Sequence, residues 1–136
     1  MPKMIFVNLP VTDLARTTRF YEAIGCVKNE EFSNDDAVSM VWSDTIYFML
    51  LKHSFYATFT KLPIADPRAT SAVLLALSRD SREEVDAIVE AAKANGGGGD
   101  TREPQDLGFM YGRTFTDPDG HVFEPVFMDM SAMPQQ

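Results

Sequence analysis

Apolar and polar positions alternate at the start of the chain and then change to a helical spacing. From Met4 to Val11 the side chains alternate with a period of two, which predicts a strand. Thr12 or Asp13 then offers an oxygen that caps a helix. Apolar residues at helical spacing continue to Gly25, which tolerates a positive φ and ends the helix. The apolar stripe of this expected helix is Leu14, Thr17, Phe20, Tyr21 and Ile24.

Three short segments with strand character follow the expected helix. We expect strands over Val27–Phe32, Ala37–Trp42 and Thr45–Leu51. The polar runs Ser33–Asp36 and Ser43–Asp44 separate them and are typical of turns. The first half of the chain therefore predicts a strand, a helix and three more strands.

Residues 52–70 connect this half to the next and have no clean period. Pro63 and Pro67 interrupt the segment, and we expect a short helix around Ala57–Lys61. Its aromatic side chains need a cover, either from the core or from a partner chain. These aromatic residues are Phe55, Tyr56 and Phe59.

The same order of elements then begins again. Ala72–Leu77 has the pattern of a strand, Asp80 or Ser81 can cap a helix, and Arg82–Asn95 has helical spacing. The run Gly96–Gly99 ends that helix. An internal duplication follows, which predicts an α+β fold of two βαβββ modules. The expected strands of this half are Asp100–Glu103, Phe109–Thr116 and His121–Met128, with a hairpin turn at Asp117–Gly120.

Composition narrows the classes of function. The 136 residues carry a formal charge of -8, which argues against nucleic-acid binding because phosphates need a basic face. Cys26 is the only cysteine, so neither an internal disulfide nor a cysteine-based zinc site is expected. No signal-peptide pattern or apolar run of about 20 residues occurs, so we expect a cytoplasmic protein without a membrane partner.

Motifs at the two ends of the chain resemble one family. Asn8–Leu14 and Phe20–Gly25 resemble the opening of glyoxalase/bleomycin-resistance/extradiol-dioxygenase proteins, the vicinal oxygen chelate superfamily, and Asp117–Glu124 resembles their closing hairpin and strand. The resemblance implies an incompletely closed eight-stranded barrel with a cleft, and a homodimer. It also implies one domain over residues 1–136, with module one at about 4–53 and module two at about 71–129.

The resemblance also allows a test for a metal site. Metal-dependent members carry one ligand on the first and last strand of each half. The matching positions here are Phe6, a residue near Leu74, one residue within Tyr47–Leu51, and Glu124. Only Glu124 is a ligand type that divalent cations use, and one carboxylate does not hold them tightly. We therefore expect no complete metal site and no cofactor.

Glu124 is the candidate catalytic residue. As a lone carboxylate in an apolar cleft it would serve as a general base or bind a cationic or hydroxylated ligand. The alternative is that it pairs with a basic residue such as Arg113. Pro125 removes a hydrogen-bond donor from the last strand, which suggests a sheet edge or a bulge beside Glu124.

Six further residues are candidates for binding a small molecule. Tyr111 and Arg113 share a strand face and would orient a polar ligand, unless they serve only strand packing. Aromatic side chains form an apolar wall of the cleft or, alternatively, part of the core. The candidate binding residues are Phe6, Asn8, Trp42, Phe48, Tyr111 and Arg113.

Three functions remain open at this point. The first is a small-molecule binding protein, of the drug-sequestering kind, without a complete metal site. The second is a metal-dependent lyase or isomerase of glyoxalase type that acts on a thiol adduct. The third is a structural or regulatory dimer whose cleft is filled by its own side chains. Metal content separates the first two, and a ligand-induced thermal shift separates the first from the third.

Overall fold

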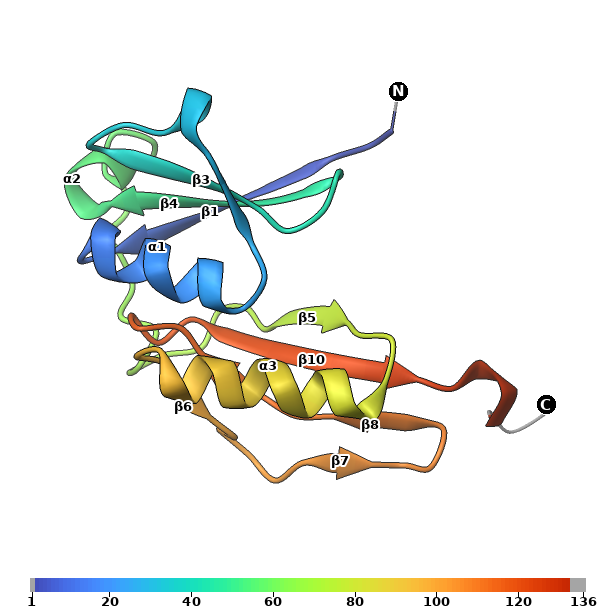
Figure 1. The fold of residues 1–136 in the computed structure, drawn as a ribbon. Coiled ribbons are helices and arrows are strands. Elements are labelled where there is room, and N and C mark those ends of the chain that lie inside the picture. The colour runs from blue at the N-terminus through green and yellow to red at the C-terminus, as the bar shows by residue number, and fades with distance from the viewer. Residues whose placement is uncertain (1, 133–136) are drawn as a thin grey trace. The chain divides into compact units, whose positions relative to one another are not determined.

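The computed structural model describes residues 2–132, which divide into two compact units with the boundary between Asp66 and Pro67. Unit 1 precedes this boundary and unit 2 follows it. Each unit consists of one sheet with one long helix packed on it (Figure 1). No helix within the described residues is long and apolar enough to span a membrane.

Unit 1 contains a four-stranded sheet in the order β1-β4-β3-β2. β1 (Ile5–Val11) runs parallel to β4 (Ile46–Lys52). β4 and β3 (Ala37–Val41) are antiparallel, as are β3 and β2 (Val27–Asn29). The crossover between β1 and the rest of the sheet carries α1 (Leu14–Ala23), as a parallel strand pair requires.

α1 begins and ends where the sequence predicts. The Asp13 side chain accepts a hydrogen bond from the Arg16 backbone N–H at 3.1 Å, and Gly25 adopts a φ of 116° just past the helix. The helix buries Tyr21 completely, and its ring lies 5.7 Å from the ring of Phe48 on β4. The apolar stripe of α1 therefore packs on the central strands of the sheet.

Two predictions for unit 1 need correction. The strand expected over Val27–Phe32 ends at Asn29, because the chain turns into a 3-10 helix over Glu30–Phe32. The side chain of Ser33 donates to the Asn29 carbonyl at 2.6 Å and closes this turn.

The short helix of the connecting segment also lies earlier than expected. α2 (His53–Tyr56) directly follows β4, whereas the sequence favoured Ala57–Lys61. Thr58 ends α2, because its hydroxyl donates to the Phe55 carbonyl at 2.7 Å and its backbone N–H donates to the same oxygen at 3.0 Å.

Unit 2 repeats the topology of unit 1. Its strand β10 runs parallel to β5 on one side and antiparallel to β8 and β9 on the other, and β7 and β6 pair with β8 and β9. β5 and β10 thus correspond to β1 and β4. The α+β class and the duplicated βαβββ order are confirmed. The elements are β5 (Leu75–Ser78), α3 (Arg82–Ala94), β6 (Gly98–Gly99), β7 (Gln105–Asp106), β8 (Met110–Gly112), β9 (Phe115–Thr116), β10 (Val122–Met128) and a 3-10 helix (Met130–Ala132).

α3 is capped by Ser81, whose hydroxyl accepts from the Glu84 backbone N–H at 3.1 Å. The Glu84 carboxylate binds Arg79 at 3.0 Å, so the reciprocal half of the capping box is not its role. The apolar face of α3 is buried against the sheet. It consists of Val85, Ile88, Val89 and Ala92.

Pro125 interrupts the sheet of unit 2 in a way the sequence did not predict. The single strand expected over Phe109–Thr116 is split into β8 and β9, and both pair with β10 in one continuous register. The Arg113 backbone N–H donates to the Pro125 carbonyl at 3.2 Å, but proline has no N–H to donate in return. Pro125 therefore lies on an interior strand without a bulge, and the missing donor divides the neighbouring strand.

Asp100–Glu103 is a loop and not the expected strand. The neighbouring pairs Gly98–Gly99 and Gln105–Asp106 form the short strands β6 and β7 instead. Asp100 has a φ of 48°, a left-handed conformation that a strand does not accommodate. Its side chain forms an ion pair with Arg113, which fixes the chain in this turn.

Candidate functional site

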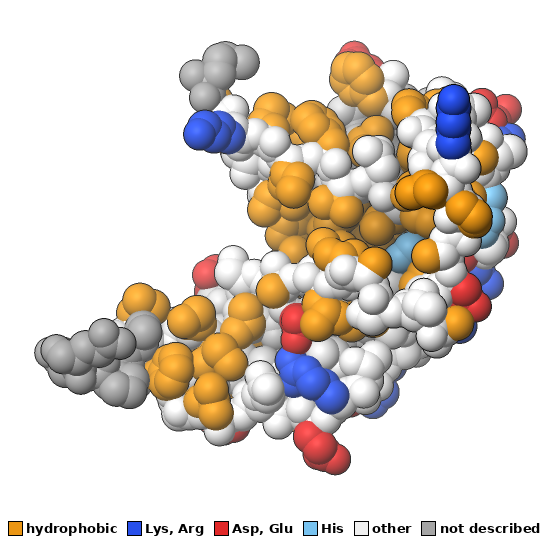
Figure 2. Space-filling model, turned by 180° about the vertical axis from the view of Figure 1, so that it is seen from behind, with side chains coloured by type: hydrophobic (Ala, Val, Ile, Leu, Met, Phe, Trp, Pro, Cys, Tyr) orange, Lys and Arg blue, Asp and Glu red, His pale blue; other side chains and the backbone are white. Residues whose placement is uncertain are grey.

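Each sheet has one face covered by its long helix and an opposite face, which we call the helix face and the open face. In unit 1, alternation along the strands places Phe6 and Asn8 on the open face, and pairing sets them beside Tyr47 and Met49. Hydrophobic side chains gather over unit 1 beside its N-terminal strand (Figure 2). The open face of unit 1 therefore offers an apolar surface with one amide.

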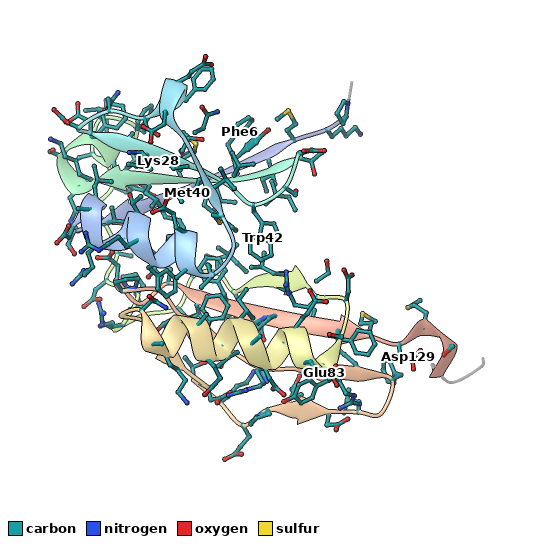
Figure 3. The ribbon with its side chains drawn as sticks, in the orientation of Figure 1. Phe6, Lys28, Met40, Trp42, Glu83 and Asp129 are labelled. Carbon is teal, nitrogen blue, oxygen red and sulfur yellow. The ribbon has the colours of Figure 1, made fainter. Side chains whose placement is uncertain are left out.

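Phe6 and its neighbour Tyr47 form the aromatic part of this surface. Their ring centroids lie 4.9 Å apart at 63°, an edge-to-face contact. The Phe6 side chain remains 53% exposed and points away from α1 (Figure 3). This leaves the Phe6 ring accessible to solvent.

Trp42 and Phe48 lie on the helix face of unit 1, which corrects the expectation of one wall formed with Phe6. Phe48 is 1% exposed and contacts Tyr21 of α1. The ring centroids of Trp42 and Phe48 lie 6.5 Å apart. A Cβ at Gly25 would lie 3.8 Å from a ring carbon of Trp42. Since successive side chains of a strand point to opposite faces, these two residues belong to the core side of the sheet.

Tyr111 and Arg113 share a face, as predicted, but it is the helix face of unit 2. The Tyr111 hydroxyl donates to Asp86 of α3 at 2.6 Å, and the Arg113 guanidinium donates to the same oxygen at 3.0 Å. Arg113 also forms a forked pair with Asp100, at 3.0 and 2.7 Å. Their polar groups thus bind the protein's own carboxylates, and we no longer assign them to a ligand.

This cluster perturbs each of its members. The hydrogen bond from Tyr111 lowers the pKa of Asp86, and the hydrogen bonds from Arg113 lower the pKa of Asp100. Conversely, the bond to Asp86 raises the pKa of Tyr111. The carboxylates are therefore held in their charged form, which suits a structural anchor between α3 and the sheet.

Glu124 lies on the open face of unit 2, opposite the face that carries Phe123 and Tyr111. Its carboxylate accepts a hydrogen bond from Arg102, with side-chain exposures of 22% for Glu124 and 36% for Arg102. The expected alternative partner, Arg113, is on the other face. Pairing of Glu124 with a basic residue is therefore correct, but the partner is Arg102.

Sequence reasoning missed Arg102 because its segment, Asp100–Glu103, is an irregular loop where the sequence predicts a strand. Loops carry no periodicity that assigns a side chain to a face. A polar pattern around it, Thr101 and Thr114, becomes meaningful only in the structure, where their hydroxyls bond to each other at 2.9 Å.

The four positions that the resemblance assigns to metal ligands are located by the duplication. The N-caps Asp13 and Ser81 correspond, which pairs Phe6 with Leu74, both 53% exposed. Asn8 lies beside Met49, and the corresponding Ala76 lies beside Glu124. The resulting set is Phe6, Met49, Leu74 and Glu124.

This set does not fit a divalent cation. A phenyl ring and an isobutyl group donate no electrons to a metal, and a thioether is a soft ligand. The one carboxylate, Glu124, is already neutralised by Arg102. No three histidine, cysteine, aspartate or glutamate side chains come together as a metal-binding group within the part of the chain that the structure describes.

Comparison with known families gives a match to the Glyoxalase/Bleomycin resistance protein/Dioxygenase superfamily over residues 3–124. The chain belongs to this superfamily. The comparison with curated proteins found no match. Members of the superfamily bind small molecules, and the superfamily itself does not specify one reaction.

Several solved structures share the fold of this chain. A hypothetical protein from S. aureus is 27% identical, with a TM-score of 0.78 over 93% of this chain and 95% of that one. A glyoxalase/bleomycin resistance protein/dioxygenase family enzyme from Burkholderia phytofirmans is 20% identical, with a TM-score of 0.74 over 93% and 99%. A fosfomycin resistance protein from Listeria monocytogenes is 21% identical, with a TM-score of 0.66 over 100% and 96%.

Proposed function

We propose that this superfamily member is a small-molecule binding protein that works without a complete metal site. The observation that carries the proposal is the composition of the four ligand positions, three of which are Phe6, Met49 and Leu74. Apolar side chains at these positions favour a ligand with hydrophobic surface. Glu124 and Arg102 supply polar recognition on the open face of unit 2.

In this proposal Glu124 contacts the ligand and is the first residue to test for any catalytic role. Arg102 holds the Glu124 side chain in place, so Glu124 presents a fixed carboxylate oxygen rather than a mobile one. In unit 1, Phe6 and Asn8 on the open face of its sheet are the residues that we propose to bind a ligand.

The decisive experiment combines metal analysis with a ligand screen. Protein purified without chelator is analysed for zinc, nickel, iron and manganese, and its thermal midpoint is measured against a library of small organic molecules. We expect less than about one tenth of a metal ion per chain, and an upward shift with some apolar ligands that have polar substituents. One bound metal per chain, lost in Glu124→Ala, would instead favour a metal-dependent lyase or isomerase.

We further propose that the chain is one domain over residues 1–136, located in the cytoplasm and paired with a second copy of itself. Exposed apolar side chains in the connecting segment support the pairing, since Phe59 is 68% and Leu62 is 76% exposed. Light scattering at micromolar concentration should give twice the 15.2 kDa chain mass. A monomeric mass at every concentration, with the same mass for Leu62→Glu, would contradict the proposed pairing.

A further inference from the structure

We propose that Arg102 is an anion-binding residue and that the ligand of this protein carries a carboxylate group. The inference rests on the proposed small-molecule function and specifies the chemistry of its ligand. It concerns only the open face of unit 2, where the Arg102 guanidinium lies beside Glu124.

Hydrogen bonds hold the loop that carries Arg102 against the open face of the sheet. The Thr101 backbone N–H and hydroxyl both bond to the Thr114 hydroxyl, at 2.7 and 2.9 Å. Thr114 is 2% exposed, and the continuous register of β10 places it opposite Glu124. Arg102 follows Thr101 directly, so the hydrogen bonds between Thr101 and Thr114 place the Arg102 side chain beside Glu124.

Asp100, the residue before Thr101, is also held in place. Asp100 has a φ of 48°, an uncommon conformation for a residue with a side chain. Its backbone N–H donates to the Thr114 carbonyl at 2.7 Å, while its carboxylate binds Arg113 on the helix face. The strained turn thus lets the chain pass from one face of the sheet to the other at this point. Strain of this kind persists where the surrounding contacts over-determine it.

The guanidinium held in this way retains donors for a ligand. Arginine has five N–H donors, and two are used, one by Glu124 and one by the Glu103 carbonyl at 3.2 Å. Three N–H donors of Arg102 therefore have no partner among residues 2–132, on a side chain that is 36% exposed. A planar fork of this kind matches the two oxygens of a carboxylate.

Glu124 competes with such a ligand for the same cation. Its carboxylate neutralises Arg102 in the free protein and repels a second carboxylate nearby. Removing the Glu124 charge while keeping its shape should therefore strengthen anion binding. If the Arg102–Glu124 pair served only stability, loss of either residue would instead lower the stability of the protein. Neither variant would then bind an anion more tightly than the wild type.

The experiment measures binding of oxalate and of its neutral isostere oxamide by calorimetry at constant ionic strength. We expect wild-type protein to bind oxalate in preference to oxamide, Arg102→Met to bind oxalate about tenfold or more weakly, and Glu124→Gln to bind it severalfold more tightly. Arg82→Met is the matched control, because Arg82 binds Asp106 at 2.9 Å in the same unit and does not contact Glu124. Its oxalate affinity should equal that of wild type.

The outcomes separate this inference from the proposed function. Equal oxalate binding by wild type and Arg102→Met, or equal binding of oxalate and oxamide, overturns the anion site. If uncharged ligands shift the thermal midpoint while oxalate does not bind, the binding function stands and Arg102 has no part in it. Circular dichroism of Arg102→Met checks its fold, and Arg102→Lys, which keeps the charge without the fork, should bind oxalate with intermediate affinity.

Discussion

Asp100 and Arg113 are joined by two hydrogen bonds, 3.0 Å from Nε to Oδ1 and 2.7 Å between the second guanidinium nitrogen and Oδ2. Arg113 is 13% exposed and also binds Asp86 of α3, so one cation links the loop, the helix and the sheet of unit 2. The stability of this unit should depend on that cation.

The first prediction concerns removal of this charge. Arg113→Met should lower the free energy of unfolding by about 2 kcal/mol, because Asp86 and Asp100 lose the cation that they share. Urea denaturation measures the change. Arg82→Met removes a solvent-exposed pair, with Asp106, and should lower the free energy of unfolding much less, because water screens the attraction. Equal losses in the two variants would show that Arg113 is no special anchor.

Acid should destabilise the protein through the same cluster. The folded-state pKa values of Asp86 and Asp100 are lowered, so protonation favours the unfolded chain. Their contribution is therefore fully present above about pH 4, the ordinary carboxyl pKa, and is lost as pH falls through the lower folded values. Urea midpoints measured between pH 7 and 2.5 should fall below about pH 4. The fall should be shallower in Arg113→Met, and an identical fall in both proteins would contradict this.

Two glycines offer a matched test of backbone strain against steric contact. Gly120 has a φ of 98° and a Cβ there would lie 2.7 Å from Cγ of Arg68, whereas Gly108 has a φ of 83° and nothing within 4 Å. Gly108→Ala should cost about 1 kcal/mol, the backbone cost alone. Gly120→Ala should cost more, because Arg68 donates to the Asp119 carbonyl at 2.8 Å and would be displaced. In an Arg68→Ala background the excess should disappear.

Cys26 should be unreactive in the folded protein. It is 5% exposed, and burial raises the pKa of its thiol to about 12 from 9.0. The thiolate, the reactive form, is therefore about a thousandfold scarcer than in the unfolded chain. A colorimetric thiol reagent should react in urea and not in buffer. Rapid reaction in buffer would mean that the region around α1 opens readily.

The helices were predictable from sequence because both periodicity and caps mark them. Asp13 and Ser81 cap the two long helices as expected, and Gly25 and Gly96 adopt positive φ values after them. The strand boundaries of unit 2 were not predictable, since they depend on where Pro125 falls opposite its neighbour. That is a property of register, which no single segment contains.

Face assignment limited the prediction of the site. Phe6 and Phe48 are both aromatic residues in alternating strands, yet one lies on the open face and the other against α1. Alternation states that neighbours differ in face but not which face the helix covers. Arg102 could not be found at all, because its position depends on a left-handed turn at Asp100.

The division of each sheet into a helix face and an open face separates folding from chemistry. Substitutions at Phe48 or Phe123 act on a packed interior and are selected against for stability alone. Substitutions at Phe6 or Leu74 act on exposed positions and leave that interior intact. A lineage with this architecture can therefore gain or lose a metal-ligating side chain at such a position by one substitution and still fold. Activities then diverge faster than the fold.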